Sequence, residues 1–159
     1  MATPPPRPKA GPLLLTAAAA LAGLLLLAGI AQLTGLALFA LPFAATAGIV
    51  ATAPSAPFAQ PRSILLGHLT ATVLALAVVA VAGPSVWAAA LAAGLSVVPM
   101  MWLRAPHPPA GATAALIALT GPAPEYLVSS VLPASLVIIG GGFLIGRLLP
   151  GHRYPAYWW

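Results

Sequence analysis

The stretch that decides the fold is HPPAGATAALIA, which runs from His107 to Ala118 in the middle of an otherwise strongly apolar chain. Its two consecutive prolines stop any helix that arrives from the N-terminal side, because proline lacks a backbone N–H and restricts the residue before it. The residues that follow, Ala110 to Ala118, are mostly small and typical of a helix. The sequence therefore predicts a helix that breaks and restarts beside a histidine.

Composition assigns the whole chain to the polytopic membrane class. Of its 159 residues 61% are hydrophobic and only 4% are charged, with a mean hydropathy of +1.04. A soluble domain could not hide this much apolar surface from water. The chain has no cysteine, which excludes a disulfide framework and a thiolate metal site.

Four segments are long enough to cross a membrane as helices, at about 20 residues each. They are residues 12–34, 63–82, 85–103 and 126–148. Two shorter segments, 36–53 and 108–120, remain. If these also cross, the chain makes six passages, and if they are re-entrant, it makes four.

The distribution of charge favours six passages. With the N-terminus inside, six passages place every Lys and Arg on the cytoplasmic side and the only acidic residue, Glu125, outside. Four passages would move Arg62 and Arg104 outside. We therefore expect a multi-pass protein of a bacterial inner (plasma) membrane with both termini cytoplasmic. We expect residues 1–11 to form a disordered basic lead and residues 151–159 to form an aromatic tail at the membrane interface.

An internal repeat relates residues 42–57 to residues 109–124, with Pro42 aligned on Pro109. The prolines, Thr46 and Thr113 match, as do serines and leucines further along, although the chain is rich in alanine and a chance match is the alternative. The predicted fold is an all-α membrane protein of two inverted three-segment repeats, about 12–83 and 84–150. Each repeat has two long transmembrane helices and one broken half-helix. The alternative is four transmembrane helices with two re-entrant segments.

In the inverted arrangement, two half-helices start near Pro42 and Pro109 and bring their N-termini together near the midplane. A helix N-terminus carries unpaired N–H groups and about half a positive charge, so it favours an anion. Small residues would let a ligand approach, and two threonines would add hydroxyl donors. The candidates for substrate binding are Ala44, Ala45, Thr46, Ala47, Gly111, Ala112, Thr113 and Ala114. The alternative is that these are proline-kinked helices whose small residues serve packing.

A second set of residues provides candidates for gating or coupling. They are Gln60, Arg62, His68, His107, Pro108 and Pro109. Arg62 is either a topology anchor or a funnel that draws anions to the cytoplasmic mouth. His68, about two turns into its helix, either packs in the core or carries a proton coupled to anion movement. His107 either orders its loop or faces a cytoplasmic vestibule.

Two stretches, HPPAGATA (107–114) and APSAPFAQPRSILLGH (53–68), resemble the HPP family of integral membrane proteins, named for its His-Pro-Pro motif. The resemblance covers about residues 12–150. The chain departs from the family pattern at several positions. Ala44 stands where the family has Gly, and Thr46 stands where the family has Ser, so the hydroxyl is kept. Characterised members are similar to nitrite transporters of chloroplast and cyanobacterial membranes, which implies nitrite or a similar small monovalent anion. The family's description as four-spanning leaves the topology open.

The expected function is therefore membrane transport of a small monovalent anion through a midplane site. The alternatives are a channel for small neutral solutes and a non-transporting structural subunit. One acidic residue and no cysteine leave almost no acid–base or nucleophilic chemistry, so we expect no enzyme. We expect no metal site, since no carboxylate or thiolate accompanies the histidines, and no cofactor. The expected partners are the anion and the lipid bilayer, with no nucleic acid, and a homo-oligomer is compatible with the sequence.

Overall fold

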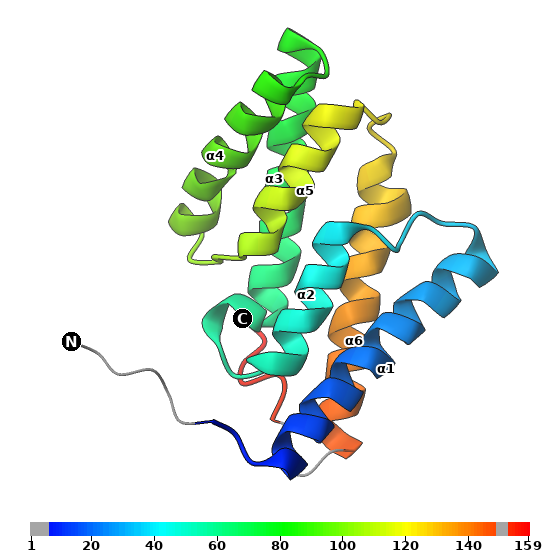
Figure 1. Ribbon diagram of the computed structural model, residues 1–159. Coiled ribbons are helices and arrows are strands. Elements are labelled where there is room, and N and C mark those ends of the chain that lie inside the picture. The colour runs from blue at the N-terminus through cyan, green and yellow to red at the C-terminus, as the bar shows by residue number, and fades with distance from the viewer. Residues whose placement is uncertain (1–6, 149–152) are drawn as a thin grey trace.

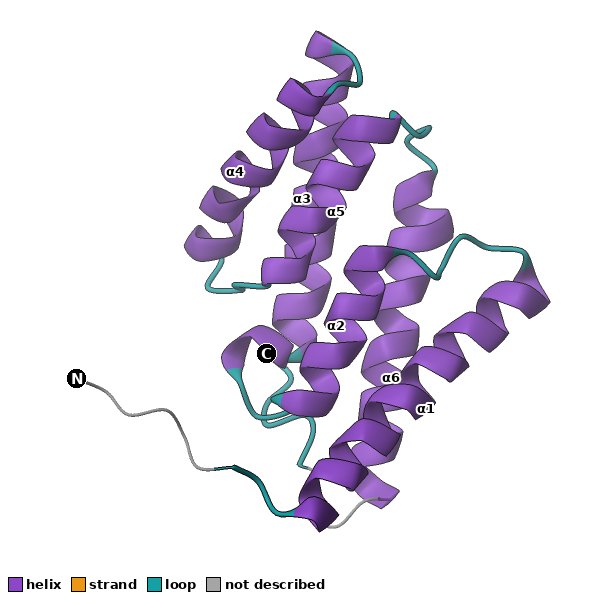
Figure 2. Ribbon diagram, viewed as in Figure 1, coloured by secondary structure: helices purple, strands orange, loops and turns teal. Residues whose placement is uncertain are grey.

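The computed structural model describes residues 7–148 and 153–159, and within this part every regular element is a helix (Figures 1 and 2). The α-helices are α1 (Ala10–Thr34), α2 (Leu41–Thr52), α3 (Pro61–Ala82), α4 (Val86–Trp102), α5 (Pro108–Thr120) and α6 (Leu132–Leu148). A 3-10 turn, Pro57–Ala59, precedes α3, and a π-helical turn, Leu127–Val131, leads into α6. The predicted all-α class is confirmed.

Proline and glycine set several of the helix boundaries. α2, α3 and α5 each have a proline at the first or second position, where a missing N–H costs nothing. Gly35 after α1 and Gly121 after α5 adopt left-handed conformations, with φ of 69° and 58°, and each N–H closes the end of its helix. The helix that restarts beside His107 is therefore present, and it begins at Pro108.

The two short helices, α2 and α5, meet near their starts and run in opposite directions away from the middle of the molecule (Figure 1). α2 packs against α1 and α6, whereas α5 packs against α4 and α3. α3 and α6 also pack against each other. This exchange of neighbours is the pattern that an inverted repeat would produce. The repeat itself, with its division between residues 83 and 84, stays a prediction.

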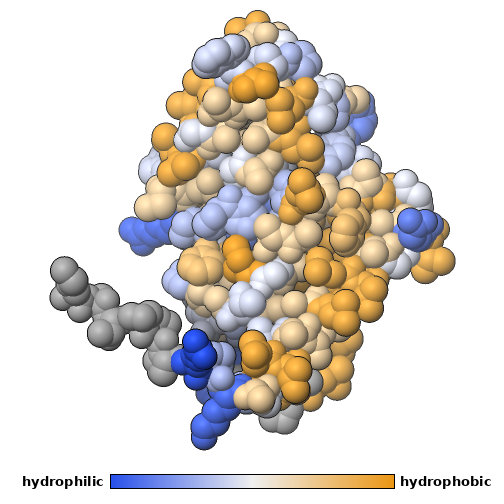
Figure 3. Space-filling model, in the orientation of Figure 1, coloured by the Kyte–Doolittle hydropathy of each residue, from blue (hydrophilic) through white to orange (hydrophobic). Residues whose placement is uncertain are grey.

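The outer surface of the helices is apolar. Within the described residues, three helical segments are long and apolar enough to cross a membrane: α1, α3, and residues 127–148, which join the π-helical turn to α6. α1 exposes many of its leucines, and one face of the molecule is largely covered by apolar side chains, with the most hydrophilic residues at its margins (Figure 3). The chain is a multi-pass membrane protein, and the number of crossings stays a prediction.

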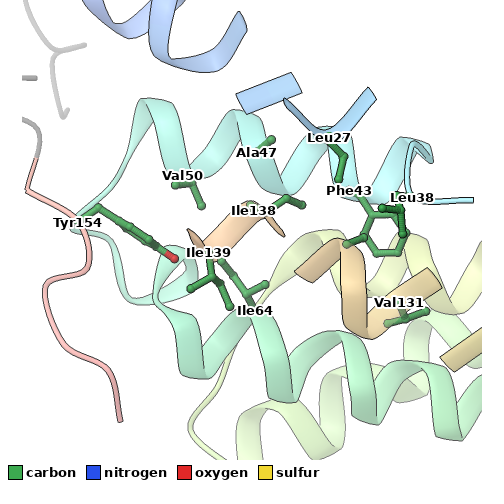
Figure 4. Close-up of a cluster of buried hydrophobic side chains, with 11 residues drawn as sticks. Leu27, Leu38, Phe43, Ala47, Val50, Ile64, Val131, Ile138, Ile139 and Tyr154 are labelled. Atoms are coloured by element: carbon green, nitrogen blue, oxygen red, sulfur yellow. The ribbon is translucent and has the colours of Figure 1, made fainter. Parts of the chain in front are cut away.

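Two packed cores hold the bundle together. The first joins α1, α2, α3 and α6 through residues such as Leu27, Phe43, Ile64 and Ile138 (Figure 4). The second lies between α3, α4 and α5 and consists mostly of alanines. Small side chains allow these helices to approach closely without a large apolar core, as is usual between membrane helices.

The C-terminal tail contributes to the first core, which the sequence did not predict. Tyr154 is 5% exposed and points into the cluster beside Val50 (Figure 4). Gly142 of α6 makes room for the ring, because a Cβ there would lie 2.9 Å from Tyr154 Cε1. Tyr154 is therefore a core residue, and the position of the tail at the membrane interface stays a prediction. Trp158 and Trp159 are exposed, and residues 151 and 152 lie outside the described residues.

Candidate functional site

The starts of α2 and α5 meet at a buried histidine of α3. Thr46 and Thr113 are each the sixth residue of their helix, and both are fully buried. His68 of α3 is also fully buried, and His107, at the N-cap of α5, is 1% exposed. These four side chains form what we call the central network.

Short hydrogen bonds join the four side chains in one continuous series. Oγ1 of Thr46 lies 3.0 Å from Nε2 of His68 and 2.9 Å from Nε2 of His107. On the far side of its ring, Nδ1 of His68 lies 2.8 Å from Oγ1 of Thr113. Nδ1 of His107 lies 2.7 Å from the carbonyl oxygen of Phe58, in the loop before α3. The network therefore links α5, α3, α2 and this loop.

With both rings neutral, the Phe58 carbonyl sets one consistent hydrogen-bond direction through the network. A carbonyl only accepts, so Nδ1 of His107 carries a proton and donates it. In a neutral ring Nε2 then accepts, and the partner is the single hydroxyl hydrogen of Thr46, which has the Pro42 carbonyl at 2.9 Å as a second acceptor. With that hydrogen used, Nε2 of His68 donates to Thr46, and Nδ1 accepts from Thr113. All four side chains are thus satisfied with both rings neutral.

A glycine permits this close approach. A Cβ on Gly67 would lie 2.7 Å from Cβ of His107 and 3.5 Å from Cβ of Ala110, so only glycine lets the start of α5 reach α3. The two imidazole rings then sit 4.7 Å apart between centroids, and the Phe43 ring lies 5.2 Å from that of His68. Our sequence analysis missed Gly67, although its place directly before His68 was a usable signal.

The backbone donors expected at the two helix starts are largely absent or already used. α5 begins with two prolines, which have no N–H, and the next N–H, on Ala110, donates to the His107 carbonyl at 2.9 Å. In α2 the N–H groups of Phe43 and Ala44 both donate to the Ala40 carbonyl at 3.0 Å. The backbone N–H groups at the two helix starts therefore contribute few of the donors that the sequence predicted there. The available donors are hydroxyl and imidazole groups, and the helix ends add a positive field.

Of the eight residues predicted to bind substrate, only the two threonines join the central network. Ala45 and Ala112, which the repeat aligns with each other, are both exposed on the outer faces of their helices. Buried or half-buried against neighbouring helices are Ala44, Ala47, Gly111 and Ala114. The polar residue at each half-helix faces inward, whereas the alanine before it faces outward.

The histidine of the HPP motif is a core residue. Its 1% exposure shows that the expectation of a vestibule-facing His107 is wrong, and its bond to Phe58 supports the alternative that it orders a loop. Pro108 is exposed and Pro109 is buried, and both occupy the first turn of α5, where proline is favoured. The motif thus places an imidazole and starts α5, whereas α4 has already ended at Trp102.

Gln60 ties the loop before α3 to the C-terminal tail. Its side chain is fully buried, and Nε2 donates to the carbonyls of Pro54 at 2.9 Å and Ala56 at 2.8 Å. Oε1 accepts from the N–H of Ala156 at 2.8 Å. These hydrogen bonds hold the loop and the tail together, and none of them reaches the central network.

Arg62 also holds neighbouring segments together. Its Nη2 donates to the Leu103 carbonyl at 2.7 Å, and its guanidinium lies 4.9 Å from the Trp159 ring centroid. The loop before α3, the α4–α5 loop and the tail therefore gather on one side of the protein. That side carries Arg62, Arg104 and Arg153, three of the six cations that the six-crossing prediction places together. Which compartment it faces stays a prediction.

A family model for the transmembrane region of HPP proteins matches residues 5–155. The chain is similar to two transmembrane proteins of Dictyostelium discoideum, with 30% identity over 125 residues and 32% over 126. Each match covers 74% of this chain but only 40% and 44% of the relatives, so the chain spans less than half of their length. No solved structure matches the chain.

Proposed function

The chain belongs to the HPP family of transmembrane proteins, and from this premise we propose that it carries a small monovalent anion across the membrane through the central network. Nitrite is the substrate that the family resemblance implies. The observation that carries the proposal is the convergence of Thr46 from α2 and Thr113 from α5 on the two sides of one buried imidazole, that of His68.

The electrostatics of the site suit an anion that must also leave. A full charge at the membrane centre costs at least about 2.5–3.5 kcal/mol on insertion scales. Two helix N-termini directed at one place supply a positive field of about half a charge each without burying an ion. The central network contains no permanently charged side chain, so binding stays weak enough for release.

The network's own hydrogen bonds close the site. Thr46 touches both imidazole Nε2 atoms at 2.9–3.0 Å, which leaves no space for an ion between these atoms. An anion therefore binds by separating hydroxyl–imidazole pairs and taking their donors. Each hydroxyl that turns toward a charged acceptor contributes roughly 1–3 kcal/mol. This exchange supplies selectivity, since a ligand without strong acceptor atoms gains nothing by opening the network.

Anion uptake into proteoliposomes tests the proposal. Purified protein would be reconstituted, and initial uptake of nitrite, nitrate, formate and chloride would be compared with protein-free vesicles at pH 8, where little neutral nitrous acid is present to cross the lipid. We expect saturable nitrite uptake about tenfold or more above the protein-free rate. If none of the four anions exceeds the protein-free rate at verified incorporation, the proposed function is wrong.

A further inference from the structure

We propose that each anion crosses together with one proton held by the His68–His107 pair, so that transport is electroneutral. The inference rests on the proposed function and deepens it by naming the co-transported ion. Its basis is a count of hydrogens and acceptors in the central network.

In the neutral network every side-chain hydrogen has an acceptor. Four hydrogens are present, one on each side chain, and each faces an acceptor: Nδ1 of His68, Oγ1 of Thr46, Nε2 of His107 and the Phe58 carbonyl, with the Pro42 carbonyl as a second acceptor for the Thr46 hydrogen. Every donor is therefore engaged within the network. An anion that entered would gain a donor only by leaving a buried imidazole nitrogen without a partner, which is unfavourable.

One added proton changes this count in favour of the anion. When Nδ1 of His68 takes a proton from a hydronium ion, an O–H bond breaks, an N–H bond forms on the ring, and the Thr113 hydroxyl loses its acceptor. The ring is now an imidazolium, and the anion is offered its charge, the new N–H and the released hydroxyl. The same event at Nε2 of His107 turns the hydroxyl of Thr46 to its other acceptor, the Pro42 carbonyl, and offers the anion the charge and the new N–H. Proton and anion therefore stabilise each other, and their charges cancel.

The Thr46 hydroxyl also allows the proton to pass between the rings. An imidazolium at His68 gives its Nε2 proton to Oγ1 of Thr46, while the hydrogen of that hydroxyl moves to Nε2 of His107. One N–H bond breaks on His68, one forms on His107, and the threonine keeps a single hydrogen. Either imidazole can therefore hold the extra proton while the other stays neutral.

The surroundings limit the pair to one extra proton. The ring centroids are 4.7 Å apart, so two imidazolium rings would repel each other strongly in a low-dielectric interior. The side chains in hydrogen-bond or ring contact with the two imidazoles are Phe43, Thr46 and Thr113, besides the rings themselves. None of these three is charged, and no carboxylate among these contacts could hold a second proton. The coupling ratio is therefore one proton to one anion.

Nitrite uptake by wild-type proteoliposomes, with a pH-sensitive dye inside and the membrane potential clamped by potassium and valinomycin, tests the coupling. We expect one proton to enter with each nitrite, and an uptake rate that is the same at 0 and −100 mV. An uncoupled monovalent anion would instead change its equilibrium distribution about 50-fold per 100 mV. Nitrous acid also crosses lipid without protein and carries one proton with each nitrite, so the protein-free rate is subtracted. Nitrate, whose acid does not cross lipid in this way, is measured in parallel.

The variant His68→Gln separates coupling from packing, since glutamine keeps hydrogen-bonding groups but cannot hold an extra proton. We expect wild-type uptake to rise as external pH falls from 8 to 6, and the variant to lose this response and at least tenfold of the uptake at pH 6. Thr70→Val is the control on the same helix, because the Thr70 hydroxyl bonds its own helix at Leu66. It should keep the wild-type pH profile.

Each outcome distinguishes the two proposals. Nitrite or nitrate uptake by the wild type that brings no proton and responds to membrane potential overturns the coupling but leaves the proposed function standing. A wild-type pH profile in His68→Gln overturns the assignment of the proton to this pair. No protein-dependent uptake of any tested anion rejects the proposed function and the coupling together.

Discussion

The substitution Gly67→Ala should disrupt the central network from outside it. The new Cβ would lie 2.7 Å from Cβ of His107, whereas ordinary contact begins at 3.4 Å, so the start of α5 must move by about 0.7 Å or more. The bond from His107 to Thr46, now 2.9 Å, would then lengthen to about 3.6 Å, beyond hydrogen-bond range.

The expected cost of this substitution follows from three contributions. Overpacking costs about 1–3 kcal/mol. The lost hydrogen bond costs about 1 kcal/mol, and the higher helix propensity of alanine returns up to about 1 kcal/mol. The free energy of unfolding should fall by about 1–3 kcal/mol, and nitrite uptake should fall tenfold or more because the relay through Thr46 is broken.

Two matched exchanges provide controls. A Cβ on Gly48 of α2 or Gly94 of α4 would meet nothing within 4 Å, so alanine there should leave stability unchanged or slightly raised. Thermal unfolding in detergent, followed by circular dichroism, and nitrite uptake would be measured for all three variants. If Gly67→Ala matched the two controls in both measurements, the inferred approach of His107 to α3 would be refuted.

Three further predictions concern topology and packing. In this cysteine-free chain, Glu125→Cys should react with an impermeant reagent only from outside and Arg104→Cys only from inside; labelling of both from one side would refute six crossings. Gly142→Ala should lower the free energy of unfolding by about 1–3 kcal/mol because it meets the core, whereas Gly140→Ala, with nothing within 4 Å, should not; equal melting temperatures would contradict this. Burial raises the pKa of the Tyr154 hydroxyl, so the stability that depends on its neutral form is complete below about pH 10 and is lost above it. Tyr154→Phe should remove that alkaline loss and, since the described residues offer the hydroxyl no partner, should add about 1 kcal/mol at neutral pH; an unchanged alkaline profile would count against it.

Local sequence was enough to predict the elements. Apolar length, proline at helix starts and glycine after helix ends are all local signals, and they located the six helices to within a few residues. The repeat also pointed to Thr46 and Thr113, which the structure places on the same imidazole. Matching positions in the two halves therefore indicated a shared location before any contact was known.

The remaining contacts depend on tertiary packing between distant residues. The bond between His107 and Phe58 spans 49 residues, and that between Gln60 and Ala156 spans 96. No local pattern shows which side chain will occupy the space that Gly67 leaves. The use of the first backbone N–H groups by their own helix turns likewise appears only once the geometry of the turn is fixed.

The most direct test of the account compares two double variants that make the same chemical change on the same two helices. Thr46→Val with Thr113→Val removes both hydroxyls of the central network, whereas Thr52→Val with Thr120→Val removes two exposed hydroxyls that bond only their own helices. Nitrite uptake would be measured in proteoliposomes at matched incorporation. We expect the central pair to lower uptake tenfold or more, since each hydroxyl contributes about 1–3 kcal/mol to a charged acceptor, and the outer pair to leave it unchanged. Uptake at the wild-type rate in the central double variant would contradict the account.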